Sequence, residues 1–345
     1  MARTKQGVAT REARHTTLGL TDDQAVRMYH TMVRARMLDE RMWLMQRMGK
    51  AAFVITGQGH EGCQVASASC LRPGHDWMHP YYRDLAAAMA WGMTARDMML
   101  AVLAKRESPE SGGRQMPGHY GSSALHIVTG SSPVGTQIPQ AVGIAMASKL
   151  KGTDEVTITY FGEGASCTGD AHGGMNFAAV FSVPVVFFLE NNLYAITVPE
   201  KWQYHVKNLS IRAEGYGFPG VTVDGNDVLA VYEVTQEAVA RARAGKGPTL
   251  IEAKTYRFTP HSSEDAQRRY RSDEEIAEWR EHHDPIKLYG AYLREAGIWD
   301  DEKEADFRDQ VKTEVDDATE YAERAAWPDP STLYDHVYKN PSTTR

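Results

Sequence analysis

Cysteine is scarce in this sequence, and the three cysteines present show no paired spacing. Cys63, Cys70 and Cys167 form no C-x-x-C pair. A disulfide framework or a structural zinc site needs paired cysteines, so the sequence argues against both. Cys63 and Cys70 are seven residues apart in EGCQVASASCL, and we interpret them as small side chains buried on one helix face. Reduced thiols fit a protein of the cytoplasm.

Long apolar runs and concentrations of positive charge are also lacking. No stretch reaches the roughly 20 apolar residues of a membrane span, and the net charge is −7 without a stripe of arginine and lysine. We therefore expect neither a membrane nor a nucleic acid as partner. The basic N-terminus, MARTKQGVATREARHTT, lacks the apolar core of a signal peptide. We interpret residues 1–18 as a flexible arm in preference to a weak transit peptide.

The centre of the chain contains short apolar runs that alternate with helical segments. The runs VTITYF, VPVVFFLE, GVTVDG and PTLIEAKTYRF are rich in β-branched and aromatic residues, and helix-like stretches such as GDAHGGMNFAAVF separate them. This order predicts βαβ units with a mostly parallel sheet. Because the runs are apolar on both faces, we expect helices to cover both sides of the sheet.

Helical segments extend this unit at both ends. After Thr21, with Gln24 at the reciprocal capping position, apolar residues repeat at helical spacing until Gly49. Residues 302–325 carry a second apolar stripe, at Phe307, Val311, Val315, Ala318 and Ala322. We expect a single α/β domain from residue 19 to 345, with a C-terminal helical extension from about residue 272.

Three polar clusters follow three of the predicted strands. GEG comes after VTITYF, NN after VPVVFFLE, and PHSS after the last strand. Because the carboxyl ends of parallel strands lie at one edge of a sheet, we expect these clusters to meet there. The carboxylate of Glu163 and the amide oxygen of Asn192 are hard ligands that suit Mg²⁺ or Ca²⁺.

A diphosphate fits the same place. Two protein side chains are too few to enclose Mg²⁺, which completes its coordination with water and ligand phosphates. Gly162 and Gly164 let the backbone approach those phosphates, and the helix that follows can direct its first amides at them. The sequence therefore predicts a magnesium–diphosphate site.

The spacing of these clusters resembles that of a known enzyme class. GEG and NN are separated by 26 residues, which is similar to the GDG and NN signature of thiamine diphosphate enzymes. HPYYRD, GRQMPGHYGS, SSPVGTQIPQAVG and PHSSEDAQRRYR extend the resemblance over nearly the whole chain, to α subunits of 2-oxo acid dehydrogenase E1 components. The branched-chain (2-oxoisovalerate) type is the most similar. The resemblance implies a thiamine diphosphate-binding α/β fold.

The resemblance also implies an activity and roles for individual residues. The implied reaction is oxidative decarboxylation of a small branched-chain 2-oxo acid, with acyl transfer to the lipoyl group of an E2 acyltransferase. His261 would lie near the thiazolium ring of the cofactor and assist this transfer. The other implied contacts are Glu163, Asn192 and the Tyr194 carbonyl for Mg²⁺, Tyr82, Arg83, Ser132, Val134, Gly164 and Ala165 for the cofactor, and Ser131, Pro133, Thr136 and Gln137 for a K⁺ ion.

A β subunit is the partner that this family implies. In the two-chain members the β subunit binds the pyrimidine half of the cofactor, and this sequence shows no second α/β repeat. We therefore expect an α2β2 heterotetramer. The loop with Ser262 and Ser263 is expected to contact the lipoyl domain of E2; phosphorylation there is the alternative.

One position leaves the substrate open. Glu190, just before the asparagines, occupies a place where some branched-chain members have an arginine that reaches the diphosphate, so one phosphate contact is expected to be missing. Pyruvate or acetoin dehydrogenase α subunits are the alternative within the family. A catalytically silent scaffold subunit is the alternative of another class.

Overall fold

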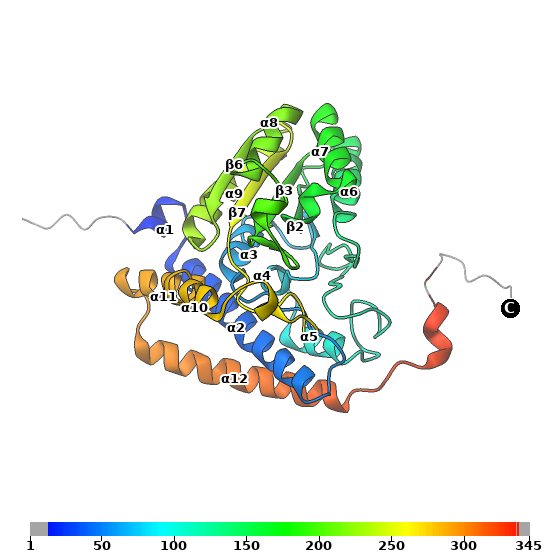
Figure 1. Ribbon diagram of the computed structural model, residues 1–345, viewed down its shortest axis with the longest axis vertical. Coiled ribbons are helices and arrows are strands. Elements are labelled where there is room, and N and C mark those ends of the chain that lie inside the picture. The colour runs from blue at the N-terminus through cyan, green and yellow to red at the C-terminus, as the bar shows by residue number, and fades with distance from the viewer. Residues whose placement is uncertain (1–12, 336, 338–345) are drawn as a thin grey trace, which may run out of the picture.

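A parallel sheet forms the centre of the molecule. The computed structural model describes residues 13–335 and residue 337. Its main sheet has the strand order β1-β2-β3-β7-β6, and every neighbouring pair is parallel (Figure 1). These strands are β1 (Trp77–His79), β2 (Thr157–Gly162), β3 (Val185–Asn191), β6 (Gly220–Asp224) and β7 (Thr249–Lys254). The small pair β4 (Tyr194–Ala195) and β5 (Val198–Pro199) is antiparallel. The predicted parallel sheet is confirmed.

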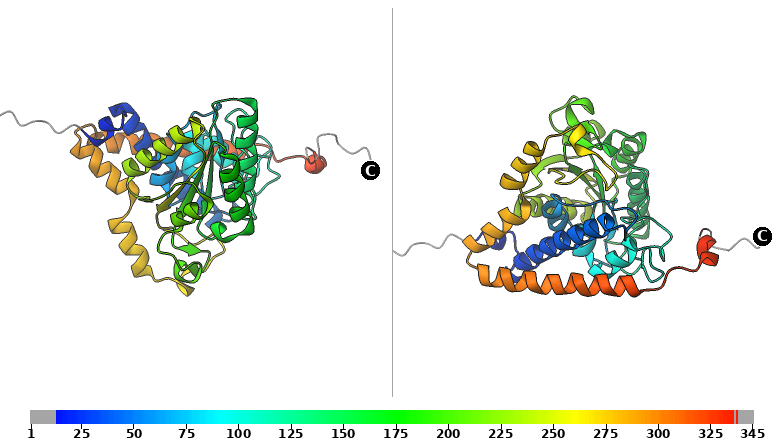
Figure 2. Two further views of the ribbon diagram at one scale, coloured as in Figure 1. Left: turned by 90° about the horizontal axis from the view of Figure 1, so that it is seen from above. Right: turned by 60° about the horizontal axis from the view of Figure 1, so that its bottom comes forward.

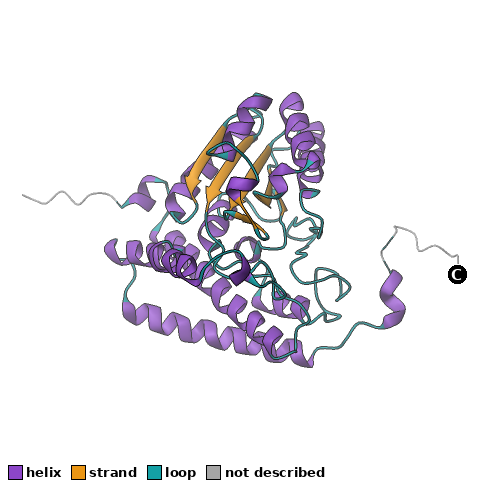
Figure 3. Cartoon of the chain, in the orientation of Figure 1, coloured by secondary structure: helices purple, strands orange, loops and turns teal. Residues whose placement is uncertain are grey.

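Helices cover both faces of this sheet (Figure 1 and Figure 3). On one face lie α6 (Gln137–Lys151) and α7 (Gly169–Phe181), and on the other α3 (Glu61–Ala68) and α9 (Val228–Arg243). The remaining α-helices are α1 (Arg14–Thr17), α2 (Asp22–Arg47), α4 (Leu85–Trp91), α5 (Ala95–Val102), α8 (Arg212–Tyr216), α10 (Asp273–His282), α11 (Pro285–Glu295) and α12 (Asp301–Arg324). The short 3-10 helices are η1 (Ala165–Cys167), η2 (Glu200–Trp202), η3 (Leu209–Ile211), η4 (Gln267–Arg269) and η5 (Pro330–Tyr334).

Strand β3 shows why the sheet is covered on both sides. Its seven residues are all buried. Val186 and Phe188 pack into the core beneath α3 and α9, whereas Phe187 and Leu189 pack into the second core, beneath α6 and α7. Since successive side chains of a strand point to opposite faces, an apolar residue at every position requires a helix layer on each face.

The terminal helices form a separate layer below the sheet. Thr21 and Gln24 make the expected capping box, with hydrogen bonds of 3.2 Å and 2.8 Å, and α2 ends just before Gly49. Helix α12 runs alongside α2 (Figure 2). Its buried side chains include the predicted stripe of Phe307, Val311, Val315, Ala318 and Ala322. Burial of this stripe, more than helix propensity, holds α12 in place.

The part of the expected N-terminal arm that the structure describes is packed against the domain. Residues 14–17 form α1, and His15 is 1% exposed. Its ring nitrogens contact the Tyr292 hydroxyl at 2.7 Å and Asp22 at 2.8 Å. These contacts attach residues 13–18 to α2 and α11, so this part of the chain is not a free arm. Residues 1–12 lie outside the described residues.

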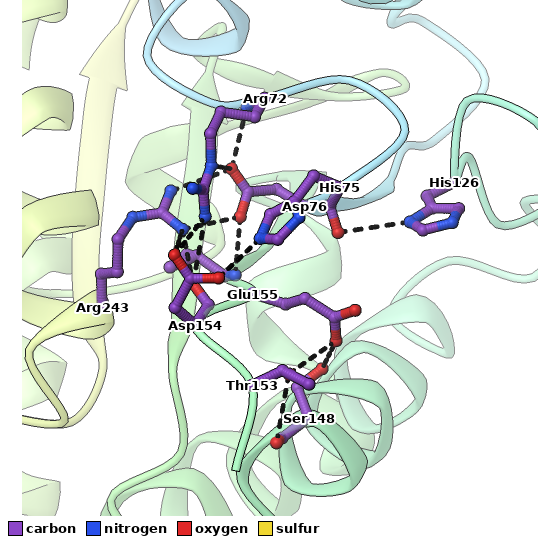
Figure 4. Close-up of polar contacts among 10 residues, drawn as sticks. Arg72, His75, Asp76, His126, Ser148, Thr153, Asp154, Glu155 and Arg243 are labelled. Atoms are coloured by element: carbon purple, nitrogen blue, oxygen red, sulfur yellow. Dashed lines mark hydrogen bonds and ion pairs between the residues drawn. The ribbon is translucent and has the colours of Figure 1, made fainter. Parts of the chain in front are cut away.

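A cluster of charged side chains joins β1, β2 and α9 at the amino ends of the strands (Figure 4). Asp76 is fully buried and accepts hydrogen bonds from the Val156 amide and from both terminal nitrogens of Arg243, all at 2.9 Å. Asp154 pairs with Arg72 at 2.9 Å and with His75 at 2.7 Å. Burial acts to raise the pKa of Asp76, but the bonds from Arg243 and the backbone outweigh it and lower that pKa. These charged side chains hold together the amino ends of β1 and β2, at the edge of the sheet opposite the GEG, NN and PHSS segments.

The cysteines stay unpaired, as expected. All three are free thiols; Cys63 is buried in α3, and Cys167 is exposed. Cys70 does not share a helix with Cys63, because α3 ends at Ala68, and it is only partly buried.

Within the described residues, no helix has both the length and the apolar character needed to cross a membrane.

Candidate active site at the carboxyl edge of the sheet

The three polar clusters meet at the carboxyl ends of β2, β3 and β7. The register pairs Gly162 with Glu190 and Glu190 with Ala253, so the segments that follow these strands begin side by side. A cavity of about 490 Å³ opens there. The predicted residues that line it are Tyr82, Arg83, Ser132, Pro133, Val134, Gln137, Glu163, Gly164, Ala165, Asn192, Tyr194 and His261. Ser131 and Thr136 lie next to this lining but not in it.

Glu163 and Asn192 form the buried floor of the site. Glu163 is 1% exposed and Asn192 4%. The Asn192 amide donates to Glu163 Oε2 at 3.1 Å, and the Tyr194 amide donates to Asn192 Oδ1 at 3.3 Å. Burial raises the pKa of the Glu163 carboxyl, against the bonds from backbone amides. Among the described residues Glu163 forms no ion pair, whereas the buried Glu61 and Glu252 do. A buried carboxylate without such a partner is costly, and a cation at this place would lower that cost.

The adjacent residues Asn191 and Asn192 make different contacts. Asn191 turns away from the cavity and donates to Glu252 and to the Tyr204 hydroxyl, both at 2.8 Å. Its Oδ1 accepts the amide of Leu193 at 3.2 Å, which stabilises the turn after β3. Leu193 and Ile196 have positive φ values of 72° and 56°, a conformation that costs roughly 1–2 kcal/mol for such residues. The strained turn brings Tyr194 and Ile196 to the cavity wall.

Two buried arginines give the cavity its positive charge. Arg83 is 2% exposed and donates to the Thr56 carbonyl at 2.6 Å; its Nε has no hydrogen-bond partner among residues 13–335 and 337. Arg257 is fully buried and donates to the carbonyls of Thr259 and Ile196, both at 3.1 Å. Among the described residues neither arginine pairs with a carboxylate, as Arg36 does with Glu61. Burial and the neighbouring Arg83 lower the pKa of Arg257 to about 10, so the Arg257 guanidinium is still charged at neutral pH.

His261 lies between these arginines. Arg83 Nη2 and Arg257 Nη1 each approach its Nδ1 at 3.4 Å. Burial, followed by the charges of Arg83 and Arg257, lowers the pKa of His261 to about 3. The ring is therefore neutral at physiological pH, and because the arginines donate to Nδ1, its proton sits on Nε2. Its backbone amide donates to Asp265 at 2.8 Å, and Asp265 also binds the hydroxyl of Tyr270.

The serine-rich loop before α6 brings together three of the four expected potassium ligands. Ser131 Oγ lies 3.0 Å from the Pro133 carbonyl, and Thr136 Oγ1 lies 3.1 Å from the same carbonyl. Gln137 instead points its amide nitrogen at the Tyr160 carbonyl, at 3.0 Å. The fourth expected ligand is therefore engaged with β2 through its nitrogen.

Glu190 does not take the place of the missing arginine in the cavity. It is fully buried on the face of β3 that points toward α3, and it accepts hydrogen bonds from Tyr81 OH at 2.9 Å and Gln64 at 3.2 Å. Burial raises the pKa of Glu190 and of the adjacent Asp84. The positive charge of the cavity comes from Arg83 and Arg257.

Sequence reasoning missed several residues of the site. Arg257, Tyr81 and Ile196 line the cavity, and His119 donates to or accepts from Ser132 Oγ at 2.9 Å. The sequence did contain one signal for Arg257. The apolar pattern predicts a strand over the whole run PTLIEAKTYRF, but β7 ends at Lys254. A charged residue so close to the carboxyl end of a strand lies where ligands bind.

These residues fit a magnesium–diphosphate cofactor. The buried guanidinium groups of Arg83 and Arg257 are hydrogen-bond donors that no anionic side chain of the described residues neutralises, and Nε of Arg83 has no partner there at all. A Cβ on Gly164 would lie 2.7 Å from the Ala195 side chain, so a larger residue would crowd this wall. No group of three His, Cys, Asp or Glu side chains suited to a metal gathers in the described residues. The expected magnesium set contains one carboxylate, supplemented by amide and carbonyl oxygens.

Comparison with known proteins agrees with this geometry. The model of the dehydrogenase E1 component family matches residues 29–331. The chain is 52% identical to 2-oxoisovalerate dehydrogenase subunit alpha of Bacillus subtilis, over 94% of this chain and 98% of that protein. It is 41% identical to the mitochondrial 2-oxoisovalerate dehydrogenase subunits alpha of Mus musculus and Homo sapiens, over 93% of this chain and 72% of each relative. The chain belongs to the dehydrogenase E1 component family.

Proposed function

We propose that this chain is the α subunit of a branched-chain 2-oxo acid dehydrogenase E1 component. One observation carries the proposal. A single cavity joins Glu163 and Asn192 to two buried arginines that, within the part of the chain that the structure describes, have no carboxylate partner. This combination of hard oxygen ligands and unpaired guanidinium groups suits a metal-bound diphosphate. The names of the relatives support a branched-chain 2-oxo acid as substrate.

The residues of the cavity take distinct roles in this proposal. Glu163, the Asn192 side chain and the Tyr194 carbonyl bind Mg²⁺. Arg83, with Tyr82, binds the diphosphate, and Arg257 adds a second positive charge. Ser132, Val134, Gly164 and Ala165 line the cofactor. Ser131, Pro133 and Thr136, with Gln137, hold a K⁺ ion that steadies their loop.

When bound, thiamine diphosphate stabilises the carbanion that loss of CO₂ from a 2-oxo acid requires. The protein binds and orients the reactants. His261, neutral and protonated on Nε2, can donate a hydrogen bond to an oxygen of the acyl group during its transfer to a lipoyl group. Because Arg83 and Arg257 occupy its Nδ1, the ring cannot act through that nitrogen without releasing them.

The proposal includes partners and a location. We infer a β subunit that completes the active site as an α2β2 heterotetramer, a lipoyl domain of an E2 acyltransferase that receives the acyl group, and a cytoplasmic enzyme. The family membership supports a β subunit and an E2 in general terms.

Co-expression with a β subunit tests the proposal. The purified complex is assayed with 3-methyl-2-oxobutanoate, pyruvate and acetoin in parallel, with thiamine diphosphate and Mg²⁺. We expect the highest kcat/KM for 3-methyl-2-oxobutanoate and no turnover by the isolated chain. A preference for pyruvate or acetoin would move the assignment to another branch of the family. Turnover by the isolated chain would refute the requirement for a β subunit.

A further inference from the structure

His60 lies against Asn192, one of the residues proposed to bind the metal. It is fully buried, and its Nε2 lies 3.3 Å from the amide nitrogen Nδ2 of Asn192. The two residues are 132 positions apart in the chain. His60 is the residue before α3, but its ring makes no capping hydrogen bond to that helix. Asn192 is the one side chain among the described residues that contacts a ring nitrogen of His60, and the backbone of Gln58 and Gly57 supplies the other polar contacts of the ring.

The backbone around His60 is held tightly. The amide of Gly59 donates to Glu61 Oε2 at 2.8 Å, and its carbonyl accepts from Thr255 Oγ1 at 2.7 Å. Gly59 has a φ of +97°, and a Cβ there would overlap the carbonyl oxygen of Tyr256. The turn is therefore clamped against the segment that follows β7. A ring held by such a turn has a fixed position relative to Asn192.

An asparagine side chain needs such a neighbour to act as a metal ligand. Its oxygen and nitrogen have almost the same shape, so a half-turn of the amide replaces an oxygen ligand by an NH₂ group that cannot bind a cation. In the structure Asn192 Oδ1 accepts from the Tyr194 amide at 3.3 Å, and Nδ2 faces His60. An acceptor at His60 Nε2 favours this orientation over the reverse one.

We infer that His60 is a positioning residue for the metal site: its Nε2 accepts a hydrogen bond from Asn192 Nδ2 and so keeps Asn192 Oδ1 available to the metal. The inference rests on the proposed function, in which Asn192 binds Mg²⁺. His60 itself does not touch the metal or the substrate. Removal of such a supporting contact typically weakens metal binding by about 10–100-fold.

Binding of Mn²⁺ in the presence of thiamine diphosphate, followed by electron paramagnetic resonance on the complex with the β subunit, tests the inference. His60→Leu removes the acceptor, and His60→Asn keeps a polar group that is too short to reach Asn192. Both are expected to raise the Kd for Mn²⁺ about 10-fold or more. His60→Gln, whose Oε1 can accept the same hydrogen bond, is expected to restore most of the affinity.

His79 provides a matched control. It is also fully buried, and its Nε2 likewise contacts an amide side chain, Gln140 Oε1 at 2.8 Å, but it does not line the cavity. His79→Leu is expected to leave the Kd for Mn²⁺ unchanged even if it lowers the melting temperature. An equal loss of Mn²⁺ affinity in His79→Leu would attribute the effect to general destabilisation and overturn the inference.

Asn192→Asp separates positioning from packing. A carboxylate presents an oxygen in either orientation, so it does not need His60 to orient it. In the Asn192→Asp background, His60→Leu is expected to change the Kd for Mn²⁺ by no more than about twofold, the range within which independent changes add. The same large loss in both backgrounds, or normal affinity in His60→Leu and His60→Asn, would overturn the inference. Normal affinity in Glu163→Gln would instead contradict the proposed function.

Discussion

Replacing Glu163 by glutamine is expected to change the stability of the empty and the loaded protein in opposite directions. The Glu163 carboxylate is 1% exposed and accepts a hydrogen bond from the Asn192 amide at 3.1 Å. Glutamine keeps the volume and one acceptor oxygen but removes the charge. Without a cofactor, loss of an uncompensated buried charge is expected to raise the free energy of unfolding by about 1–2 kcal/mol.

With the cofactor the same change is expected to be unfavourable. At 100 times its Kd, a ligand that binds only the folded state adds about 2.7 kcal/mol of stability. For a unit of 345 residues, an unfolding entropy of about 2.1 cal/mol/K per residue converts this into a rise in Tm of about 4 °C. Glu163→Gln removes the carboxylate ligand and should abolish this rise.

Differential scanning calorimetry of the complex, with and without thiamine diphosphate and Mg²⁺, measures both effects. Glu190→Gln is the matched control, because Glu190 is equally buried, near the carboxyl end of the neighbouring strand β3, but does not line the cavity. We expect the control to keep the cofactor-induced rise in Tm. A Glu163→Gln variant with the full rise would refute the assignment of Glu163 as a metal ligand.

Three further perturbations follow from the structure. His261→Ala should retain the cofactor-induced rise in Tm and lose acyl transfer to lipoamide, and normal transfer would contradict the role of His261. Because the pKa of His261 is about 3, the contribution of this residue to the transfer rate should not vary with pH between about 5 and 8. Gly164→Ala places a Cβ 2.7 Å from the Ala195 side chain and should lower the free energy of unfolding by about 1–3 kcal/mol. Gly173→Ala in α7 has open space around the new Cβ and should not destabilise that helix. Equal denaturant midpoints for the two variants would refute this difference. Asp76→Asn should lower the free energy of unfolding by about 3 kcal/mol. Because the folded-state pKa of Asp76 is lowered, the stabilisation by this carboxylate is present above its unfolded pKa of about 3.9 and is lost as the pH falls further. The Tm of the variant should therefore depend less on pH in the acid range.

The sheet could be predicted because its strands are apolar at every position. Val186 and Phe188 face one core and Phe187 and Leu189 the other, and that pattern fits a strand covered on both sides. The polar residues after such strands could then be assigned to one edge without knowledge of any side-chain contact. Strand β1 was missed because its three residues, from Trp77 to His79, are too few to show a period.

The contacts that complete the site depend on long-range packing. His60, in the turn before α3, reaches Asn192 only because that turn is clamped to the segment after β7. The position of Arg257 depends on where β7 ends, and strand boundaries are weakly encoded in the sequence. The orientation of Glu190 toward Tyr81 and Gln64 follows from its place on β3, two residues after Phe188. A glutamate at position 190, where some branched-chain members have an arginine, therefore changes the cavity less than the sequence suggested.

A crystal structure of the complex with thiamine diphosphate and Mn²⁺, with anomalous data at the manganese edge, tests the central claim most directly. We predict one anomalous peak in each α subunit, with the manganese ion bound by Glu163, Asn192 Oδ1 and the Tyr194 carbonyl at about the 2.0–2.2 Å of hard-oxygen coordination. The diphosphate should lie on the same ion, within hydrogen-bonding distance of Arg83. A metal or a diphosphate bound elsewhere, with Glu163 and Asn192 free of it, would contradict the account.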